Sequence, residues 1–282
     1  MKSLRDLWPL EPAVTFLNHG AFGACPTEVL RHQSALRAEM EAEPVRFLIR
    51  ELDERLVAEL ARRGIETLVD GAHAPGMVPL DLRTLGATYY SANCHKWLCA
   101  PKGSAFLWVR RDRQAEIHPL TISHGATAVR PGRSRFRLEF DWTGTQDPTA
   151  WLTVPRAIEY LGGLVPGGWP ALMARNRALA LEARRLLCDA TGTPSPCPDQ
   201  MIGSLASVPL PDSPTMETGW RVRDPLQGRL FDGWGIEVPI MRWPAPPRRL
   251  LRISAQLYNS PDQYARLADA LGKELAAERG TT

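Results

Sequence analysis

The amino-acid sequence predicts an α/β fold that ends in a smaller α+β domain. Short segments rich in apolar and aromatic residues, each bounded by glycines or charged residues, have the length and composition of strands. Longer segments with apolar residues at three- and four-residue spacings lie before and after them and predict helices. Strands that alternate with helices are typical of an α/β sheet, and a last strand followed by a last helix is typical of a small α+β domain.

The first long helix is predicted over about residues 28–63. It follows the segment FLNHGAFGACP, which is predicted as extended chain that turns into the helix, and Thr27 is expected to cap it. Pro44 must break or kink this run of apolar spacings. Gly64 is the expected stop.

Three strands are predicted after this helix, as part of one sheet. The first covers residues 65–69 and ends at Asp70, before a glycine-containing turn. The second lies in ATYYSANCHKW, and the third lies in GSAFLWVRRD, between a glycine and charged residues.

Two helices and a small domain are predicted for the second half. A helix is expected from Pro148, a long amphipathic helix over about 169–188, and then a turn-rich join at TGTPSPCPDQ. The segment LRISAQLYNS and a final helix from Pro261 complete the small domain. We therefore expect two domains, residues 1–150 and residues 151–282.

Composition and charge favour a small-molecule function. Among the 282 residues, 34 basic and 31 acidic side chains leave a net charge of +3, too small to indicate nucleic-acid binding. No apolar stretch is long enough for a membrane span, and Asp6 stands where a signal peptide needs apolar residues, so a cytoplasmic location is expected. The five cysteines form no CxxC pair, which argues against disulfides. A zinc site at Cys94, His95 and Cys99 lacks a fourth ligand.

A carboxylate and a lysine mark the predicted chemistry. Asp70 ends a strand, where α/β sheets bind ligands, although a turn-capping role is the alternative. Lys96 lies between His95 and Trp97 in an apolar context, and partial burial favours the neutral amine that a Schiff base requires. The other candidate, Lys102, lies in a Pro-Lys-Gly turn that is typical of a solvated loop.

Five separated motifs then resemble one family. They are FLNHGAFGACP, VDGAHAPG, NCHKWLCAPKG, WTGTQD and LRISAQLYNS, and they occur in the family's order. The sequence resembles the class V aminotransferase-like enzymes of fold type I, which use pyridoxal phosphate, and among them the isopenicillin N epimerase-like proteins. The resemblance implies an incomplete large domain of a fold type I PLP-dependent transferase and a smaller C-terminal domain.

The resemblance assigns roles to the residues around the cofactor. Lys96 would bind pyridoxal 5'-phosphate covalently, and Asp70 would keep its ring nitrogen protonated. His73 would lie near the phenolic oxygen of the cofactor. Ser91 and His95 would lie by the phosphate and by Lys96.

The resemblance also implies a homodimer and an amino-acid substrate. Gly144 and Thr145 would reach the phosphate of the neighbouring subunit, with helix capping as the alternative role of Thr145. Arg252 would clamp the substrate α-carboxylate, with an ion pair to an acidic surface residue as its alternative. Asn18 and His19 would line the substrate pocket. No metal site is implied.

The chain departs from the family in its length. The interval from Asn18 to Asp70 is so short that the resemblance implies the internal loss of roughly a hundred residues or more, with a seam near Leu56 and Val57. The lost stretch would carry the first strands of the large sheet and the turn that donates to the cofactor phosphate. Weak cofactor retention is therefore expected.

The resemblance implies an enzyme that acts at the Cα of an amino acid, with epimerisation as the preferred reaction and with activity impaired by the lost segment. A lyase or a transaminase would use the same Asp70 and Lys96. Cysteine desulfurase activity is disfavoured because no cysteine lies between Cys197 and Arg252. The alternative from another class is a non-catalytic remnant that keeps the dimer surface.

Overall fold

The computed structural model shows two compact units, residues 1–56 and residues 57–282. The boundary between the units coincides with the seam that the sequence predicts. The structure describes residues 4–10, 26–42, 52–216 and 223–280.

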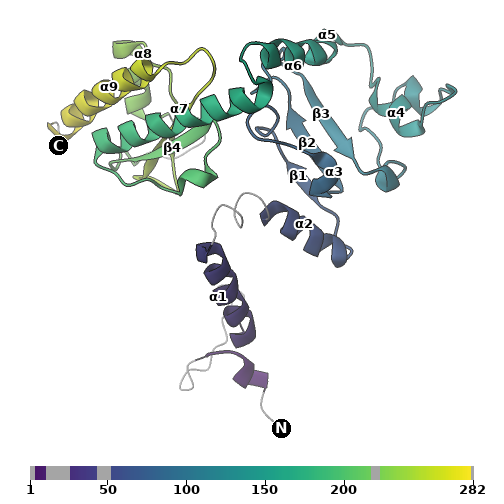
Figure 1. Cartoon of the computed structure of the whole chain (residues 1–282), viewed down its shortest axis with the longest axis horizontal. Coiled ribbons are helices and arrows are strands. Elements are labelled where there is room, and N and C mark those ends of the chain that lie inside the picture. Colours follow the sequence, from purple (N-terminus) through teal and green to yellow (C-terminus); the bar gives the residue numbers. More distant parts are fainter. Residues whose placement is uncertain (1–3, 11–25, 43–51, 217–222, 281–282) are drawn as a thin grey trace. The chain divides into compact units, whose positions relative to one another are not determined.

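The first unit is helical where it is described (Figure 1). It contains η1 (Leu4–Leu7), α1 (Thr27–Ala42) and the start of α2 (Leu52–Arg62). The single predicted helix is therefore seen as two helices, and Pro44 lies outside the described residues. Gly64 follows α2 with φ of 71°, in the left-handed conformation that ends many helices, as predicted.

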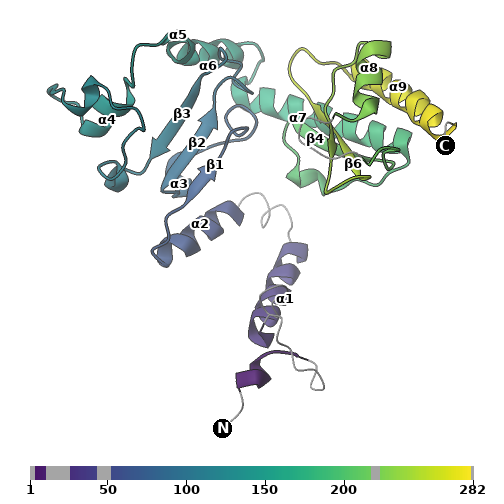
Figure 2. The same ribbon diagram turned by 180° about the vertical axis from the view of Figure 1, so that it is seen from behind.

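A three-stranded sheet and the loops that follow its first two strands carry five of the ten predicted site residues, Asp70, His73, Ser91, His95 and Lys96. Its strands are β1 (Leu68–Asp70), β2 (Tyr89–Asn93) and β3 (Ala105–Val109), in the order β1-β2-β3. β1 and β2 are parallel, and β2 and β3 are antiparallel (Figure 2). The first strand begins later than predicted because the N–H of Ile65 donates to the carbonyl of Leu60 at 2.9 Å and extends the end of the helix.

Short helices follow and precede these strands. Asp81 caps α3 (Leu82–Leu85), which lies between β1 and β2 in the chain. The helix predicted from Pro148 is divided at Thr153, since Pro155 has no N–H to donate to the preceding turn. The remaining elements of this half are η3 (Arg111–Arg113), η4 (His124–Ala126), α4 (Arg135–Phe140), α5 (Thr149–Leu152) and α6 (Val154–Gly163).

The C-terminal half contains an antiparallel sheet packed against helices. The strand order is β4-β6-β5, with α7 and α9 packed against each other and α8 beside α9 (Figure 1). The elements are α7 (Gly168–Thr191), η5 (Asp199–Met201), β4 (Leu205–Leu210), α8 (Pro225–Trp234), β5 (Ile240–Arg242), β6 (Arg249–Ser254) and α9 (Pro261–Gly280).

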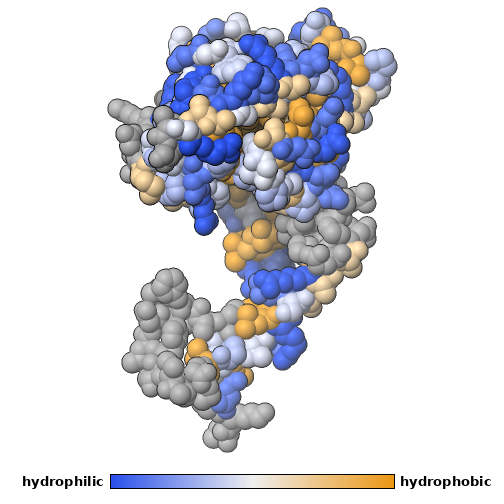
Figure 3. All heavy atoms as spheres, turned by 90° about the vertical axis from the view of Figure 1, so that its left-hand side faces the viewer, coloured by the Kyte–Doolittle hydropathy of each residue, from blue (hydrophilic) through white to orange (hydrophobic). Residues whose placement is uncertain are grey.

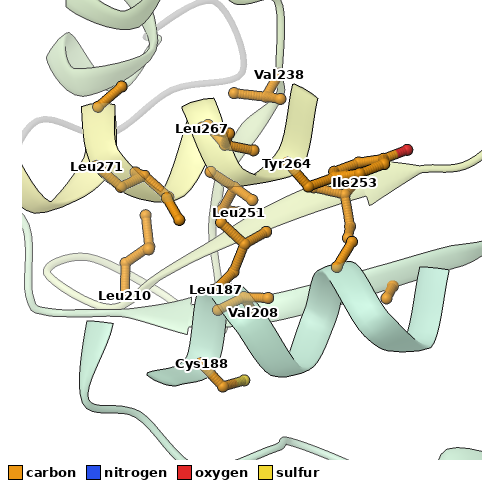
Figure 4. Packing of buried hydrophobic residues seen from close by; sticks show 14 of the residues in the cluster. Leu187, Cys188, Val208, Leu210, Val238, Leu251, Ile253, Tyr264, Leu267 and Leu271 are labelled. Carbon is orange, nitrogen blue, oxygen red and sulfur yellow. The ribbon is translucent and has the colours of Figure 1, made fainter. Parts of the chain in front are cut away.

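Alternation along β6 decides which of its side chains face the helices. Leu251 and Ile253 are buried in a core that includes Leu187 of α7 and Leu267 of α9 (Figure 4). Successive side chains of a strand point to opposite faces. Arg252, between the two, therefore points away from this core.

The surface carries mixed side chains. Hydrophilic and hydrophobic residues are interspersed on the face shown in Figure 3. Among the described helices, none combines the length and the hydrophobicity that a membrane crossing requires.

Candidate active site

Lys96 lies in a tight loop between β2 and β3. The backbone N–H groups of Cys94 and His95 both donate to the carbonyl of Ser104, at 3.0 and 3.3 Å. The Nδ1 atom of the His95 ring lies 2.9 Å from the same oxygen. The N–H of Ala100 donates to the carbonyl of Cys94 at 3.1 Å. His95 thus closes the loop that holds Lys96, and its predicted role by the phosphate stays a prediction.

The turn that follows β1 packs closely on β2 and on this loop, through two glycines. A Cβ at Gly71 would lie 1.8 Å from the hydroxyl of Tyr90. At Gly76, where φ is 83°, a Cβ would lie 2.9 Å from the carbonyl oxygen of Trp97. The two glycines therefore let His73, which lies between them in the chain, approach the lysine loop.

His73 links Lys96 to Trp97. Its Nε2 is 3.2 Å from Nζ of Lys96, and its Nδ1 is 3.1 Å from the indole Nε1 of Trp97. An indole nitrogen can only donate, so Nδ1 must be the unprotonated acceptor. A neutral imidazole that accepts this hydrogen bond carries its proton on Nε2, the nitrogen that faces Nζ of Lys96.

The surroundings of His73 keep its ring neutral. Burial lowers the pKa of His73 below its usual 6.5, and the positive charges of Lys96 and Arg252 lower this pKa further. The carboxylate of Asp70 opposes them with a smaller effect. A lysine, an arginine and an aspartate therefore act on one imidazole, which makes it the centre of the candidate site.

We expect this histidine to make the fold less stable in acid. Its folded-state pKa lies below the unfolded value near 6.5, so the unfolded chain binds more protons there. The stability that neutral His73 contributes is complete above the unfolded pKa and is lost as the pH falls through the folded pKa. Urea unfolding at roughly pH 7.5 and pH 5 measures this loss, which should be smaller in His73→Gln. Equal losses in the two proteins would contradict the assignment.

Asp70 and Ser91 lie side by side on neighbouring strands. They are paired in the parallel register of β1 and β2, so their side chains project from the same face of the sheet. Both residues are exposed. Oδ1 of Asp70 accepts the N–H of Ala72 at 3.0 Å, so the turn-capping role is present and leaves Oδ2 for a ligand.

Arg252 presents a donor that has no protein acceptor. Its Nε is buried and forms no hydrogen bond, and among the described residues Arg252 forms no salt bridge. The alternative of an ion pair with an acidic surface residue is therefore not seen in that part of the chain. Because a buried N–H without an acceptor is costly, this atom is suited to an oxygen of a ligand.

Gln256 joins the lysine loop to the second sheet. Its Nε2 lies 3.5 Å from the carbonyl oxygen of Trp97 and 3.4 Å from Sγ of Cys99. Its Oε1 accepts from Nδ2 of Asn176 at 2.8 Å and from the N–H of Leu257 at 2.9 Å. Because both of these partners are donors, the orientation of the Gln256 amide is fixed.

The other candidates lie in simpler surroundings. Gly144 has φ of 146°, and Thr145 is exposed. The N–H of Thr149 donates to Oδ1 of Asp147 at 2.9 Å, so Asp147 and not Thr145 caps α5. The role of Gly144 and Thr145 toward a second subunit stays a prediction.

Lys102 is exposed in its turn, which leaves Lys96 as the lysine in contact with the candidate site. Within the described ranges, no group of three or more His, Cys, Asp or Glu side chains could hold a metal ion, so the zinc alternative has no support there. Asn18 and His19 lie outside the described residues.

Sequence reasoning did not assign roles to Trp97 and Gln256. Trp97 directly follows the lysine, and Gln256 lies within LRISAQLYNS, so both stood inside the quoted motifs. The available signal was a side chain with a hydrogen-bond donor in an otherwise apolar setting, since such groups require partners when buried.

Comparison with known proteins gives the family. The family model of class V aminotransferases matches residues 46–208. The chain belongs to the class V aminotransferase family. Members of this family are pyridoxal phosphate enzymes, which confirms the cofactor class that the motifs imply.

The curated relatives of this class V aminotransferase include an epimerase and a desulfhydrase. The chain is 36% identical over 232 residues to isopenicillin N epimerase of Streptomyces clavuligerus. The aligned region covers 77% of this chain and 54% of that protein. It is 32% identical over 227 residues to a probable chloroplastic L-cysteine desulfhydrase of Arabidopsis thaliana. Here the aligned region covers 77% of this chain and 46% of that protein. The chain thus spans about half the length of the curated relatives it matches, in agreement with the predicted loss.

Solved structures agree with the class V assignment at the level of the fold. A cysteine desulfurase from Thermococcus onnurineus has a TM-score of 0.61 at 17% identity, over 79% of this chain and 56% of that one. A cysteine desulfurase from Escherichia coli has a TM-score of 0.59 at 20% identity, over 80% of this chain and 55% of that one. The predicted fold is confirmed as a partial large domain of fold type I.

Proposed function

We propose that the chain is a pyridoxal-phosphate-dependent enzyme that moves a proton at the Cα of an amino acid, with epimerisation as its reaction. The observation that carries the proposal is the contact of 3.2 Å between Nζ of Lys96 and Nε2 of His73, beside the charges of Arg252 and Asp70. The 36% identity to isopenicillin N epimerase supports the choice of reaction.

The residues fit two of the three parts of the cofactor. The amine of Lys96, in contact with His73, suits the aldehyde, and the exposed carboxylate of Asp70 suits a protonated ring nitrogen. The phosphate has fewer hydrogen-bond donors than it needs. A dianion requires several donors, and Ser91 offers one hydroxyl, on the same face of the sheet as Asp70. The site therefore fits the aldehyde and the ring nitrogen of the cofactor better than its phosphate.

The side chains divide the work of the proposed reaction. Bound pyridoxal phosphate supplies a ring that accepts electron density from the substrate Cα. Arg252 binds and orients the substrate carboxylate, and the buried Nε gives it a donor that the protein leaves open. Asp70 holds a proton at the ring nitrogen. Lys96 takes the proton from one face of Cα or returns it, with His73 beside it.

A desulfhydrase-type lyase is the second candidate. The identity of 32% to a probable L-cysteine desulfhydrase favours it. It would use the same Lys96 and Asp70 and would differ after the proton leaves Cα, when the β-substituent is expelled. A transaminase, and a non-catalytic remnant, complete the alternatives. We further propose a homodimer in which Gly144 and Thr145 serve the partner's phosphate site, and a cytoplasmic location.

Proton exchange at Cα tests the proposal independently of the final product. The chain is incubated with pyridoxal phosphate and single amino acids in D₂O, and deuterium at Cα is followed by mass spectrometry and chiral chromatography. Deuterated product of both configurations supports epimerisation, and sulfide with pyruvate from L-cysteine supports the lyase. No exchange with any amino acid at saturating cofactor would overturn the enzyme proposal.

Asp70→Asn is expected to reduce turnover far more than it reduces cofactor binding. An ionic hydrogen bond to the ring nitrogen is worth roughly 1.5–3 kcal/mol, and an amide no longer favours the protonated ring. Deuterium exchange should therefore fall by about tenfold or more, while cofactor affinity changes less. Ser91→Ala is the matched control on the neighbouring strand and should instead weaken cofactor binding. Unchanged exchange in Asp70→Asn would exclude the proposed role.

A further inference from the structure

We propose that Gln256 is a positioning residue that holds the Lys96 loop in place by keeping Cys99 in the left-handed backbone conformation. The inference rests on the proposed function, because it explains how the fold places Lys96 for that reaction. The amide of Gln256 contacts Trp97 and Cys99, which follow Lys96 in the loop, so it acts on the lysine through the backbone.

Cys99 has an unusual backbone conformation for its residue type. Within the described ranges it is the one residue other than glycine with a positive φ, of 51°. A side chain disfavours this conformation because its Cβ approaches the following carbonyl oxygen. Such a residue persists only where its surroundings hold it.

The turn at the lysine depends on the conformation of Cys99. Its N–H donates to the carbonyl of Lys96 at 3.1 Å, and the next N–H, of Ala100, donates to the carbonyl of Cys94 at 3.1 Å. These two N–H groups lie on either side of the Cα of Cys99, so its dihedral angles decide whether both hydrogen bonds can form at once. The carbonyl of Lys96 is therefore held only while Cys99 stays left-handed.

The amide of Gln256 is placed to stabilise this turn. Its Nε2 lies 3.4 Å from Sγ of Cys99 and 3.5 Å from the carbonyl oxygen of Trp97. The two contacts lie on either side of Leu98 and hold the chain that leads into Cys99. The turn after β1 confines the same carbonyl of Trp97, since a Cβ at Gly76 would lie 2.9 Å from its oxygen.

The direction of this amide is set by its other partners. Gln256 is 6% exposed, and its Oε1 accepts from the N–H of Leu257 and from Nδ2 of the fully buried Asn176. Oδ1 of Asn176 in turn faces Nη1 of Arg175 at 3.4 Å, and a guanidinium can only donate. The N–H of Gln256 donates to Oδ1 of Asn259 at 3.0 Å. The donor that faces the lysine loop is therefore fixed before the loop closes on it.

Amide hydrogen exchange of the chain without cofactor tests the inference. Gln256→Met keeps the length of the side chain and removes the donor. Asn176→Leu is the matched control, because both substitutions remove the buried hydrogen bond between Asn176 and Gln256, and only Gln256→Met removes the donor to the loop. Leu271 of α9, which is fully buried, serves as the internal reference for opening of the C-terminal core.

We expect the N–H groups of Cys99 and Ala100 to exchange about two- to tenfold faster, relative to Leu271, in Gln256→Met. This range corresponds to the loss of one hydrogen bond. Asn176→Leu should produce no comparable change.

Substitution of Cys99 separates this role from a general loss of packing. Glycine adopts the left-handed conformation at no steric cost, whereas alanine keeps the Cβ. Cys99→Gly added to Gln256→Met should therefore restore slow exchange at Ala100, and Cys99→Ala added to Gln256→Met should not. Both substitutions remove the thiol, so the comparison isolates the backbone.

A negative φ at Cys99 in the native chain, measured from its one-bond Cα–Hα coupling, would overturn the inference even if Gln256→Met does not fold. Equal exchange in Gln256→Met and Asn176→Leu, or equal effects of glycine and alanine at position 99, would overturn it as well. None of these measurements involves pyridoxal phosphate, so failure of the proposed enzyme activity is recognised separately by the deuterium exchange at Cα.

Discussion

Borohydride reduction of the chain in the presence of pyridoxal phosphate is expected to attach the pyridoxyl group to Lys96 and to leave Lys102 unlabelled. Lys96 is half-buried, and its Nζ lies 3.2 Å from Nε2 of His73 in the candidate site. Lys102 is exposed in a turn, away from the residues that would hold the cofactor. Peptide mapping of the reduced chain measures the distribution of the label.

Lys96→Ala should abolish both this labelling and all deuterium exchange at Cα, the largest effect expected for any single substitution. Lys102→Ala, six positions further along the same loop region, is the matched control and should keep both. Label on Lys102 in the native chain, or on no lysine at saturating cofactor, would show that the assignment of Lys96 is wrong.

The affinity of the chain for pyridoxal phosphate is expected to be at least about a hundredfold lower than that of a full-length relative. Two or three charge-assisted hydrogen bonds to the phosphate, at roughly 1.5–3 kcal/mol each, are lost with the missing segment. The covalent link to Lys96 offsets part of this loss. Ser91, exposed on β2, cannot replace a set of donors.

Titration of the visible absorbance with pyridoxal phosphate, and with pyridoxal lacking the phosphate, measures this effect. In the isopenicillin N epimerase of Streptomyces clavuligerus as the control, the phosphate should improve binding strongly. In this chain the phosphate should improve binding by much less. A stoichiometric yellow protein that survives dialysis would mean that the shortened fold has rebuilt its phosphate site.

Most of the fold could be predicted from local patterns. The strands that became β2 and β3 are apolar and bounded by glycine or charge, and the amphipathic run that became α7 has helical spacing. β4 was not predicted, because Pro209 lies within it and proline normally argues against a strand. The strand order explains the exception, since β4 is at the edge of its sheet.

The helix α8 was also not predicted, for a different reason. Gly228 and Gly233 lower its intrinsic helix propensity. Tertiary packing outweighs this cost, since Leu226 and Leu230 are fully buried and Asp224 caps the first turn. Such packing cannot be read from the segment alone.

The candidate site was predictable as a list of residues but not as a geometry. Asp70 and Lys96 follow from their motifs and from the strand that precedes each. The contact of His73 with Trp97 depends on how closely the turn after β1 approaches the lysine loop, and that approach is set by Gly71 and Gly76 against distant partners. Backbone clearance of this kind leaves no periodic signal in a sequence.

Gln256, four residues after Arg252, would connect the proposed carboxylate site to the lysine loop. Arg252 lies on β6, and the chain that leaves this strand carries the amide that holds Trp97 and Cys99. We therefore expect carboxylate binding at Arg252 and the conformation of the lysine loop to be coupled. Such coupling is reciprocal, so a change that stabilises the bound conformation of the loop should raise the affinity for the carboxylate by the same factor.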